Sequence, residues 1–554
     1  MQHQVQWLVY RSKQTMLLCG HITTSFLVFL FTCLRTCFTP LREALLRRQA
    51  TMFLYPLLAV VPAYLFYFYF WKGRHLPPGP FQLPVLGSAL TLMGKTPIGQ
   101  VLRKLEKRYG SIYTLNVGGL EAVVVNDWEM IKEHFIKNGH AFAGRPYFYF
   151  LLDVMRGGYH GIILTAGAKW KEQRRFALHT LRDLGFGRSL MEEYVLNEIG
   201  HFTRAVDRMA EDNQGVVDLK VPIQNCVGNI INYVVLGCRY DDDGASVQKV
   251  RTAMDEFSSG LGGDWRVALL TFPWSRFLPF MRGIYALVKR TMDEFNAVFA
   301  PQLASIERAV RDASEGDDVE SKSLCEAYVQ RLGAIEAGKA EKGFFDRPQM
   351  LATIFDIWAA GFDTTVTTLY WFFLYMIHYP EVMRRCQAEM DERLGRETPV
   401  RMEHKKELPF TTATVNELQR CINLVQMNVQ HTCTEDVVVG GYRLKKGTII
   451  VPQISAVLMD ERHFPQPARF DPNRHLEEDG VTPKKCEQLV PFSVGKRSCL
   501  GESLARIELF LVFANFFRQF SVEKAPFEPM PKLEALQPAL PAAIPYSCLV
   551  RRRS

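Results

Sequence analysis

The chain has 554 residues, 48% hydrophobic and 22% charged, which is enough for a large core and a soluble surface and excludes wholesale disorder. Its net charge of +8 is moderate and not gathered in a tail, so nucleic acid is a poorer candidate partner than an acidic protein or an anionic membrane surface. The 12 cysteines include no C-x-x-C pair, which argues against a disulfide scaffold or a zinc site. Most of them should be buried thiols in a reducing compartment.

The N-terminal part of the chain carries two apolar stretches. The first, Met16–Leu34, is interrupted by polar residues and lies in an N-terminal extension, residues 1–51. The second, Met52–Trp71, has no charge, and twenty helical residues at ~1.5 Å each span the ~30 Å hydrocarbon layer of a bilayer. Basic residues and a Pro-Pro-Gly-Pro turn follow in residues 72–80. We therefore predict a transmembrane anchor at 52–71 and a stiff hinge at 72–80, with a buried core helix as the alternative.

Residues 81–554 contain no low-complexity linker or internal repeat, apart from a polar interruption at about residues 311–342, and predict one large domain. Tyr113–Val125 predicts a β-hairpin across two central glycines, and Asn126 or Asp127 could cap the helix that follows. Apolar periodicity predicts helices at Ser189–Ala210, Ile284–Arg311, Met350–Tyr379 and Glu502–Phe520, and a short strand at Thr448–Pro452. The expected fold is mainly α with a small β part.

A segment near the C-terminus has the spacing F-x-x-G-x-R-x-C-x-G and is followed by an apolar helix. Its matched residues are Phe492, Gly495, Arg497, Cys499 and Gly501. Cys499 lies just before the helix, where free N–H groups and the positive dipole end favour the thiolate that binds iron. Gly495 and Gly501 would let the backbone approach a flat ring closely, and Phe492 would shield the sulfur from water. The segment predicts a metal-binding thiolate.

These five positions resemble the haem-binding loop of the cytochrome P-450 superfamily, and residues 408–520 are close to its animal microsomal, drug- and lipid-metabolising type. The resemblance implies a P-450 fold with residues 81–554 as the haem-binding catalytic domain. It implies haem b, iron protoporphyrin IX, with Cys499 as the axial ligand of the iron and Arg497 on a haem propionate. Further residues that resemble propionate contacts of the family are Trp170 and Arg174 in W-x-x-x-R, Arg145 in FAGRP and His431 in VQHT.

The helix predicted at Met350–Tyr379 contains Ala-Gly-Phe-Asp-Thr-Thr at residues 360–365, similar to the oxygen-activating segment of the family. The resemblance implies that Thr364 and Asp363 guide protons to dioxygen. Gly361 costs a helix ~1 kcal/mol relative to alanine, which is consistent with a local opening for dioxygen. The alternative is that the small residues merely pack against another helix.

The resemblance also covers an E-x-x-R pair, Glu417 and Arg420, and assigns Arg469 in PARF as the arginine that locks to them. These three residues should stabilise the loop beneath the haem rather than take part in the chemistry.

Some positions depart from the family pattern and put local rigidity and substrate orientation in doubt. They are Gln426 and Lys445, which replace prolines, and Ala468, which replaces a glutamate.

The implied reaction inserts one atom of dioxygen into an apolar substrate and reduces the other to water. No G-x-G-x-x-G follows a strand, so electrons should come from NADPH through a separate flavoprotein reductase, with cytochrome b5 as a further candidate partner. A basic docking face for these acidic proteins would comprise Lys169, Lys171, Arg174, Arg175, Lys496 and Arg497. Two alternatives stay open: a haem-thiolate isomerase or dehydratase, and a non-enzymatic haem-binding sensor or carrier.

The substrate cannot be named from the sequence, beyond an apolar and aromatic pocket. Its candidate residues are Tyr147, Phe148, Phe150, Leu151, Phe355, Trp358 and Val429. The expected location is the endoplasmic reticulum membrane with the catalytic domain in the cytosol, and a mitochondrial membrane is the alternative. With that orientation, the arginines between the two apolar stretches would be lumenal, against the positive-inside bias. We therefore predict that the functional protein begins at or near Met52, with a removable presequence as the alternative.

Overall fold

The computed structural model describes residues 59–60, 62–64, 66–67, 73–84, 86–92, 96, 98–185, 189–240, 248–249, 252, 255, 273–312, 321–396, 398–535 and 541–553. The predicted extension at 1–51 lies outside these residues, as does most of the predicted anchor at 52–71. Among the helices that are described, none combines the length and apolarity needed to cross a bilayer. The anchor therefore stays a prediction.

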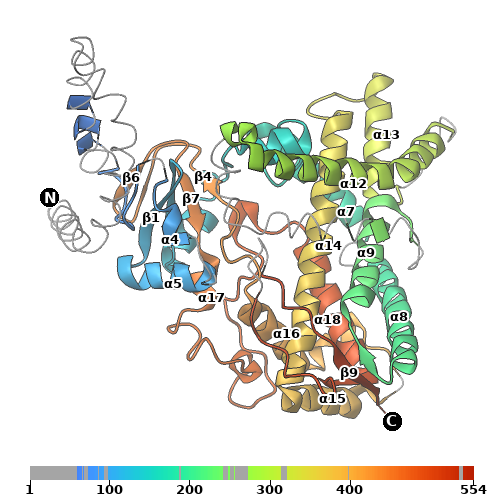
Figure 1. Ribbon diagram of the computed structural model, residues 1–554. Coiled ribbons are helices and arrows are strands. Elements are labelled where there is room, and N and C mark those ends of the chain that lie inside the picture. The colour runs from blue at the N-terminus through green and yellow to red at the C-terminus, as the bar shows by residue number, and fades with distance from the viewer. Residues whose placement is uncertain are drawn as a thin grey trace.

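Helices make up most of the described chain, as predicted, and a smaller sheet part lies beside them (Figure 1). The helices are α4 (Ala89–Leu92), α5 (Ile98–Tyr109), α6 (Trp128–Ile131), α7 (Gly167–Asp183), α8 (Ser189–Asp212), α9 (Lys220–Leu236), α12 (Pro279–Asp312), α13 (Leu324–Glu336), α14 (Arg347–His378), α15 (Pro380–Leu394), α16 (Pro409–Ile422), α17 (Ile454–Leu458) and α18 (Glu502–Gln519). Shorter helical turns are η2 (Lys132–Lys137), η3 (Phe150–Val154), η4 (Pro273–Phe277), η5 (Met402–Lys406), η6 (Pro472–His475) and η7 (Gly495–Arg497).

The main sheet has the strand order β1-β2-β7-β4, and two smaller sheets are β3-β9-β8 and β5-β6. The strands are β1 (Ile112–Val117), β2 (Leu120–Val125), β3 (Val216–Val217), β4 (His431–Thr432), β5 (Val437–Val439), β6 (Tyr442–Leu444), β7 (Ile449–Pro452), β8 (Phe520–Lys524) and β9 (Cys548–Arg552). The predicted hairpin is confirmed as β1 and β2. Asp127 caps α6 by accepting a hydrogen bond from the backbone N–H of Met130 at 3.2 Å.

Helix α14 runs through the helical part and is apolar on nearly all sides, because it packs against α9, α18 and β8. It begins where the Asp346 carboxylate accepts from the N–H of Gln349 at 2.7 Å, and it ends at Tyr379, the residue before Pro380. Against α9, the indole N–H of Trp358 donates to Asn232 at 2.7 Å. A Cβ on Gly361 would lie 2.7 Å from Ile231, so this glycine permits the close approach of the two helices.

Glu417 and Arg420 pair with a distant arginine, as predicted, but the prediction that this arginine is Arg469 is wrong. The buried Glu417 carboxylate accepts from Arg420, Arg474 and His475, each at 2.8 Å, whereas Arg469 contributes only its backbone carbonyl. Two neighbouring P-x-R spacings lie at residues 467–469 and 472–474, and only the second arginine lies on η6 beside α16. Burial would raise the pKa of Glu417, yet the hydrogen bonds from Arg420 and His475 hold it at about 2.

Gln426, which stands where the family pattern has a proline, is held in place by local hydrogen bonds. Its side-chain carbonyl accepts from the N–H of Gly99 near the start of α5, at 2.9 Å. Its backbone carbonyl accepts from Gln453 at 2.6 Å and from Ser455 at 2.8 Å. Three hydrogen bonds therefore fix the segment where the family pattern has a proline.

Candidate functional site

The loop that carries Cys499 depends on the backbone freedom of a glycine. Gly495 has φ +72°, and a Cβ there would lie 1.9 Å from the carbonyl oxygen of Phe135 in η2. Gly495 thus lets the loop press against another backbone segment. The N–H of Cys499 donates to the carbonyl of Phe492 at 2.9 Å, and α18 begins three residues further on, so the predicted place of the thiol before a helix is confirmed.

The Cys499 side chain keeps an exposed surface, although protein atoms surround its sulfur closely. Burial raises the pKa of its thiol. The N–H of Gly501 and the charges of Arg174 and Arg506 oppose that shift without cancelling it. Iron bound to the sulfur would favour the thiolate that the sequence predicts at this position.

Two of the predicted propionate contacts are brought together by the main sheet. Gly144 pairs with Thr432 through backbone hydrogen bonds of 3.2 and 3.1 Å, which places Arg145 beside β4 and its His431. Arg145 donates to the carbonyls of Ile163 at 3.0 Å and Gln430 at 2.7 Å. Burial, and then the charge of Arg145, lower the pKa of His431 well below its usual value, so this imidazole is neutral.

Arg497 and Arg174 complete a cluster of positive charges around this position. Arg497 donates to the carbonyl oxygens of Ala143 at 2.9 Å and Thr165 at 2.6 Å, while Arg174 donates to that of Ser498 at 2.8 Å. Burial lowers the pKa of Arg497, and the charges of Arg145 and Arg174 lower it further. Because arginine stays charged in proteins, the cluster calls for an anion.

The cluster fits a ligand with acid groups. Within the part of the chain that the structure describes, no carboxylate forms an ion pair with Arg145, Arg174 or Arg497. The indole N–H of Trp170 is buried without a hydrogen-bond partner, and the Arg497 guanidinium lies 3.7 Å from the centre of its ring. An unused donor among uncompensated arginines, next to an accessible thiol, suits the two carboxylates and the iron of haem.

Helix α14, which carries the predicted oxygen-activating segment at residues 360–365, contacts the same apolar cluster as the thiol loop. Ile357 of α14 and Leu500 of the loop both pack against a cluster that includes Trp170. The hydroxyl of Thr364 donates to the carbonyl of Ala360 at 2.6 Å. The helix is continuous through Gly361, so the predicted local opening is not seen in the backbone, and close packing on α9 explains this glycine.

Some residues predicted for the substrate pocket belong to the core instead. Phe355 and Trp358 lie 5.0 and 5.3 Å from the ring of Phe295 in α12, and Phe150 lies 5.2 Å from the ring of Tyr285. Tyr147 and Val429 are exposed. Helical spacing placed Phe355 and Trp358 on α14 correctly but did not reveal which side of the helix faces the thiol loop.

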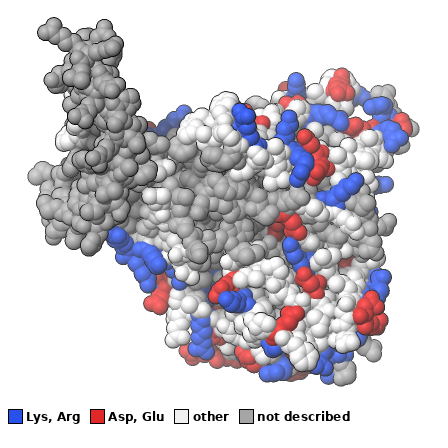
Figure 2. Space-filling view, viewed as in Figure 1, with Lys and Arg blue, Asp and Glu red and all other residues white. Residues whose placement is uncertain are grey.

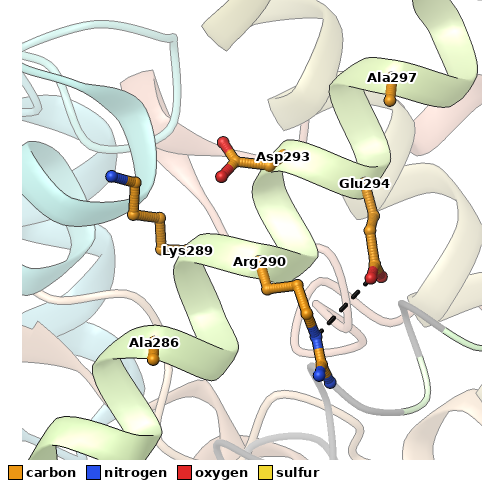
Figure 3. Close-up of a pocket in the computed structure, with 6 residues that line it drawn as sticks. All are labelled: Ala286, Lys289, Arg290, Asp293, Glu294 and Ala297. Atoms are coloured by element: carbon orange, nitrogen blue, oxygen red, sulfur yellow. Dashed lines mark ion pairs between the residues drawn. The ribbon is translucent and has the colours of Figure 1, made fainter.

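A separate hollow lies along α12 (Figure 3). It is lined by Ala286, Lys289, Arg290, Asp293, Glu294 and Ala297. Arg290 and Glu294 form an ion pair of 3.6 Å. The side chains of Lys289 and Asp293 point away from this ion pair (Figure 3). No lining residue belongs to α14, α18 or the thiol loop, so this hollow is not part of the site.

The predicted basic docking face is smaller than expected. Lys171 and Arg175, one turn apart on α7, and Lys496 of the loop are exposed, whereas Arg174 and Arg497 turn inward. Lys169 is half-buried and donates to the carbonyl of Tyr159 at 2.7 Å. On the face that Figure 2 shows, basic and acidic side chains of the described residues are interspersed, without a broad patch of one sign.

The helical fold, the accessible cysteine before α18 and the uncompensated arginines define a haem-thiolate protein. Residues 77–546 match the cytochrome P450 family, and the chain belongs to that family. It is a cytochrome P450 monooxygenase with a haem-thiolate cofactor, which uses dioxygen and an electron donor.

Relatives cover most of the chain at about one third identity. Cytochrome P450 2M1 of Oncorhynchus mykiss is 32% identical over 453 residues, which is 81% of this chain and 87% of that protein. Cytochrome P450 2C3 of Oryctolagus cuniculus is 33% identical over 458 residues, 82% of this chain and 90% of that protein. Cytochrome P450 2J2 of Homo sapiens is 31% identical over 450 residues, 81% and 86% of the two chains.

Proposed function

We propose that this monooxygenase oxidises an apolar small molecule, such as a lipid, steroid, fatty acid or xenobiotic, with Cys499 as the axial ligand of the haem iron. The observation that carries the assignment is the unused indole N–H of Trp170 among the arginines beside the accessible thiol. When bound, haem with a thiolate ligand supplies the activation of dioxygen and of a C–H bond. Trp170, Arg145, Arg174, Arg497 and His431 would hold its acid groups.

The test of this function is oxygen insertion itself. Haem-loaded protein in vesicles with NADPH and a flavoprotein reductase is incubated with a broad lipid and small-molecule mixture under heavy-isotope dioxygen. The proposal expects products that carry one heavy oxygen atom, formed only with NADPH. Products without added oxygen, formed without NADPH, would instead indicate an isomerase or dehydratase, and no product from any apolar class would contradict the proposed substrate class.

Thr364 would position a proton at its Oγ1, one turn from the exposed Ala360. We expect Thr364→Ala to keep consuming NADPH and dioxygen while product per NADPH falls at least about tenfold and peroxide rises, since positioned proton transfer contributes roughly 100-fold or more. The matched control is Thr368→Ala, which removes the same kind of hydroxyl bond one turn further on. Equal product yields for both variants would mean that Thr364 only packs.

The exposed residues Lys171, Arg175 and Lys496 support docking of an acidic reductase beside the thiol loop, with cytochrome b5 as a second candidate. We expect Lys171→Glu with Arg175→Glu to lower reductase-supported turnover about tenfold at low salt and to leave peroxide-driven turnover intact. Lys104→Glu with Lys107→Glu on the exposed face of α5 makes the same change in net charge elsewhere. A similar loss in both double variants, or in both assays, would refute docking at α7.

We also propose that the protein works at the endoplasmic reticulum membrane, anchored by residues 52–71, with its catalytic part in the cytosol. The uncharged stretch followed by basic residues and the proline turn supports this arrangement.

A further inference from the structure

The short segment 161–165 supplies the carbonyl groups that hold two of the arginines of the haem site. Arg497 donates to Thr165 at 2.6 Å and to Ile162 at 3.4 Å, and Arg145 donates to Ile163 at 3.0 Å. The directions of both guanidinium groups therefore depend on how this stretch of backbone is oriented.

The same segment is held on its other side by α14. The Asp356 carboxylate accepts from the N–H of Ile162 at 2.8 Å and of Ile163 at 2.9 Å. Gln349 forms two hydrogen bonds of 3.1 Å with the N–H and the carbonyl of Gly161. Gly161 has φ +91°, and a Cβ there would lie 2.4 Å from the Asp356 oxygen. The backbone thus lies directly against the helix.

The remaining oxygen of Asp356 is used by Arg156. The Arg156 guanidinium donates to it at 2.9 and 2.5 Å, and the two side chains are 7% and 0% exposed. The carboxylate is therefore saturated by two amides and one guanidinium. On α14 it precedes Ala360 and Thr364 by four and eight residues, so the three share one face of the helix.

We propose that Asp356 is a positioning residue, which sets the amides of Ile162 and Ile163 and thereby aims Arg497 and Arg145 at the acid groups of haem. The inference rests on the proposed haem site. It links the helix that carries Thr364 to the residues that hold the cofactor. A plain buried ion pair with Arg156, needed only for stability, is the competing explanation.

Three variants separate the two explanations: Asp356→Leu, Arg156→Met and the two together. One oxygen of Asp356 accepts from both amides, and leucine has a similar shape but no acceptor, so the segment should shift even when no charge is left unpaired. We expect Asp356→Leu and the double variant to lose haem to excess apomyoglobin at least about tenfold faster than wild type, and to change the ferric/ferrous reduction potential. Arg156→Met should stay within about threefold of the wild-type rate of haem loss.

The double variant carries the test even where Asp356→Leu alone does not fold, since it buries no unpaired charge. Wild-type haem loss and potential in the double variant would overturn the inference and leave only the ion pair. The control is Glu198→Gln, which breaks the 2.8 Å pair with Arg239 and should lower the melting temperature without faster haem loss. Wild-type protein that binds haem without a thiolate would instead overturn the proposed haem site.

Discussion

Cys499→Ser should lower oxygen insertion at least about a thousandfold in protein that still contains haem, which makes it the largest effect expected of a single substitution. A serine hydroxyl in the same place cannot supply the electron density of a thiolate. Product formed per haem with NADPH and reductase is the measurement. The control is Cys486→Ser, a half-buried cysteine outside the loop at residues 492–501, which should keep wild-type turnover. Substantial turnover by haem-loaded Cys499→Ser would assign the ligand elsewhere.

The second large effect is on stability, at Glu417. Glu417→Gln should lower the free energy of unfolding by about 3–5 kcal/mol, because it leaves the buried Arg420 and the half-buried Arg474 without their counter-ion. Urea unfolding at neutral pH measures the change. Glu487→Gln, which removes an exposed ion pair with Lys132, should cost less than about 1 kcal/mol. Equal costs for the two variants would show that the Glu417 cluster does not support the fold.

The same carboxylate predicts a pH dependence. Its pKa is about 2 in the folded protein and near 4.5 when free, so the folded state binds fewer protons over that range. The contribution of Glu417, roughly 3 kcal/mol, should be complete above about pH 4.5 and lost as the pH falls towards 2. In Glu417→Gln the unfolding free energy should fall less steeply across this window than in wild type, and parallel curves would contradict the assignment.

Local sequence patterns predicted those parts of the molecule that local physics determines. Apolar periodicity located α8, α12, α14 and α18 to within a few residues at most ends, and the glycine pair located the hairpin. The spacing around Cys499 placed the thiol before α18. These features depend on residues close together in sequence, where backbone geometry limits the choices.

The errors concern contacts between distant segments. The PARF sequence at residues 467–470 selected Arg469, whereas the packing of η6 on α16 brings Arg474 of the next P-x-R spacing to Glu417. The sequence indicated that Lys169 is an exposed surface charge, whereas its ammonium group donates a hydrogen bond to the carbonyl of Tyr159. The contacts of Asp356 also went unrecognised, although a carboxylate between apolar residues of a helix is itself a signal of a buried partner.

The central claim is that a Cys499 thiolate ligates the haem iron. The most direct test is the absorption spectrum of the ferrous carbon monoxide complex of folded, haem-loaded wild-type protein. The account predicts the red-shifted Soret band that thiolate ligation produces, and the loss of that band in Cys499→Ser. An unshifted Soret band in active wild-type protein, or a red-shifted band that survives in Cys499→Ser, would contradict it.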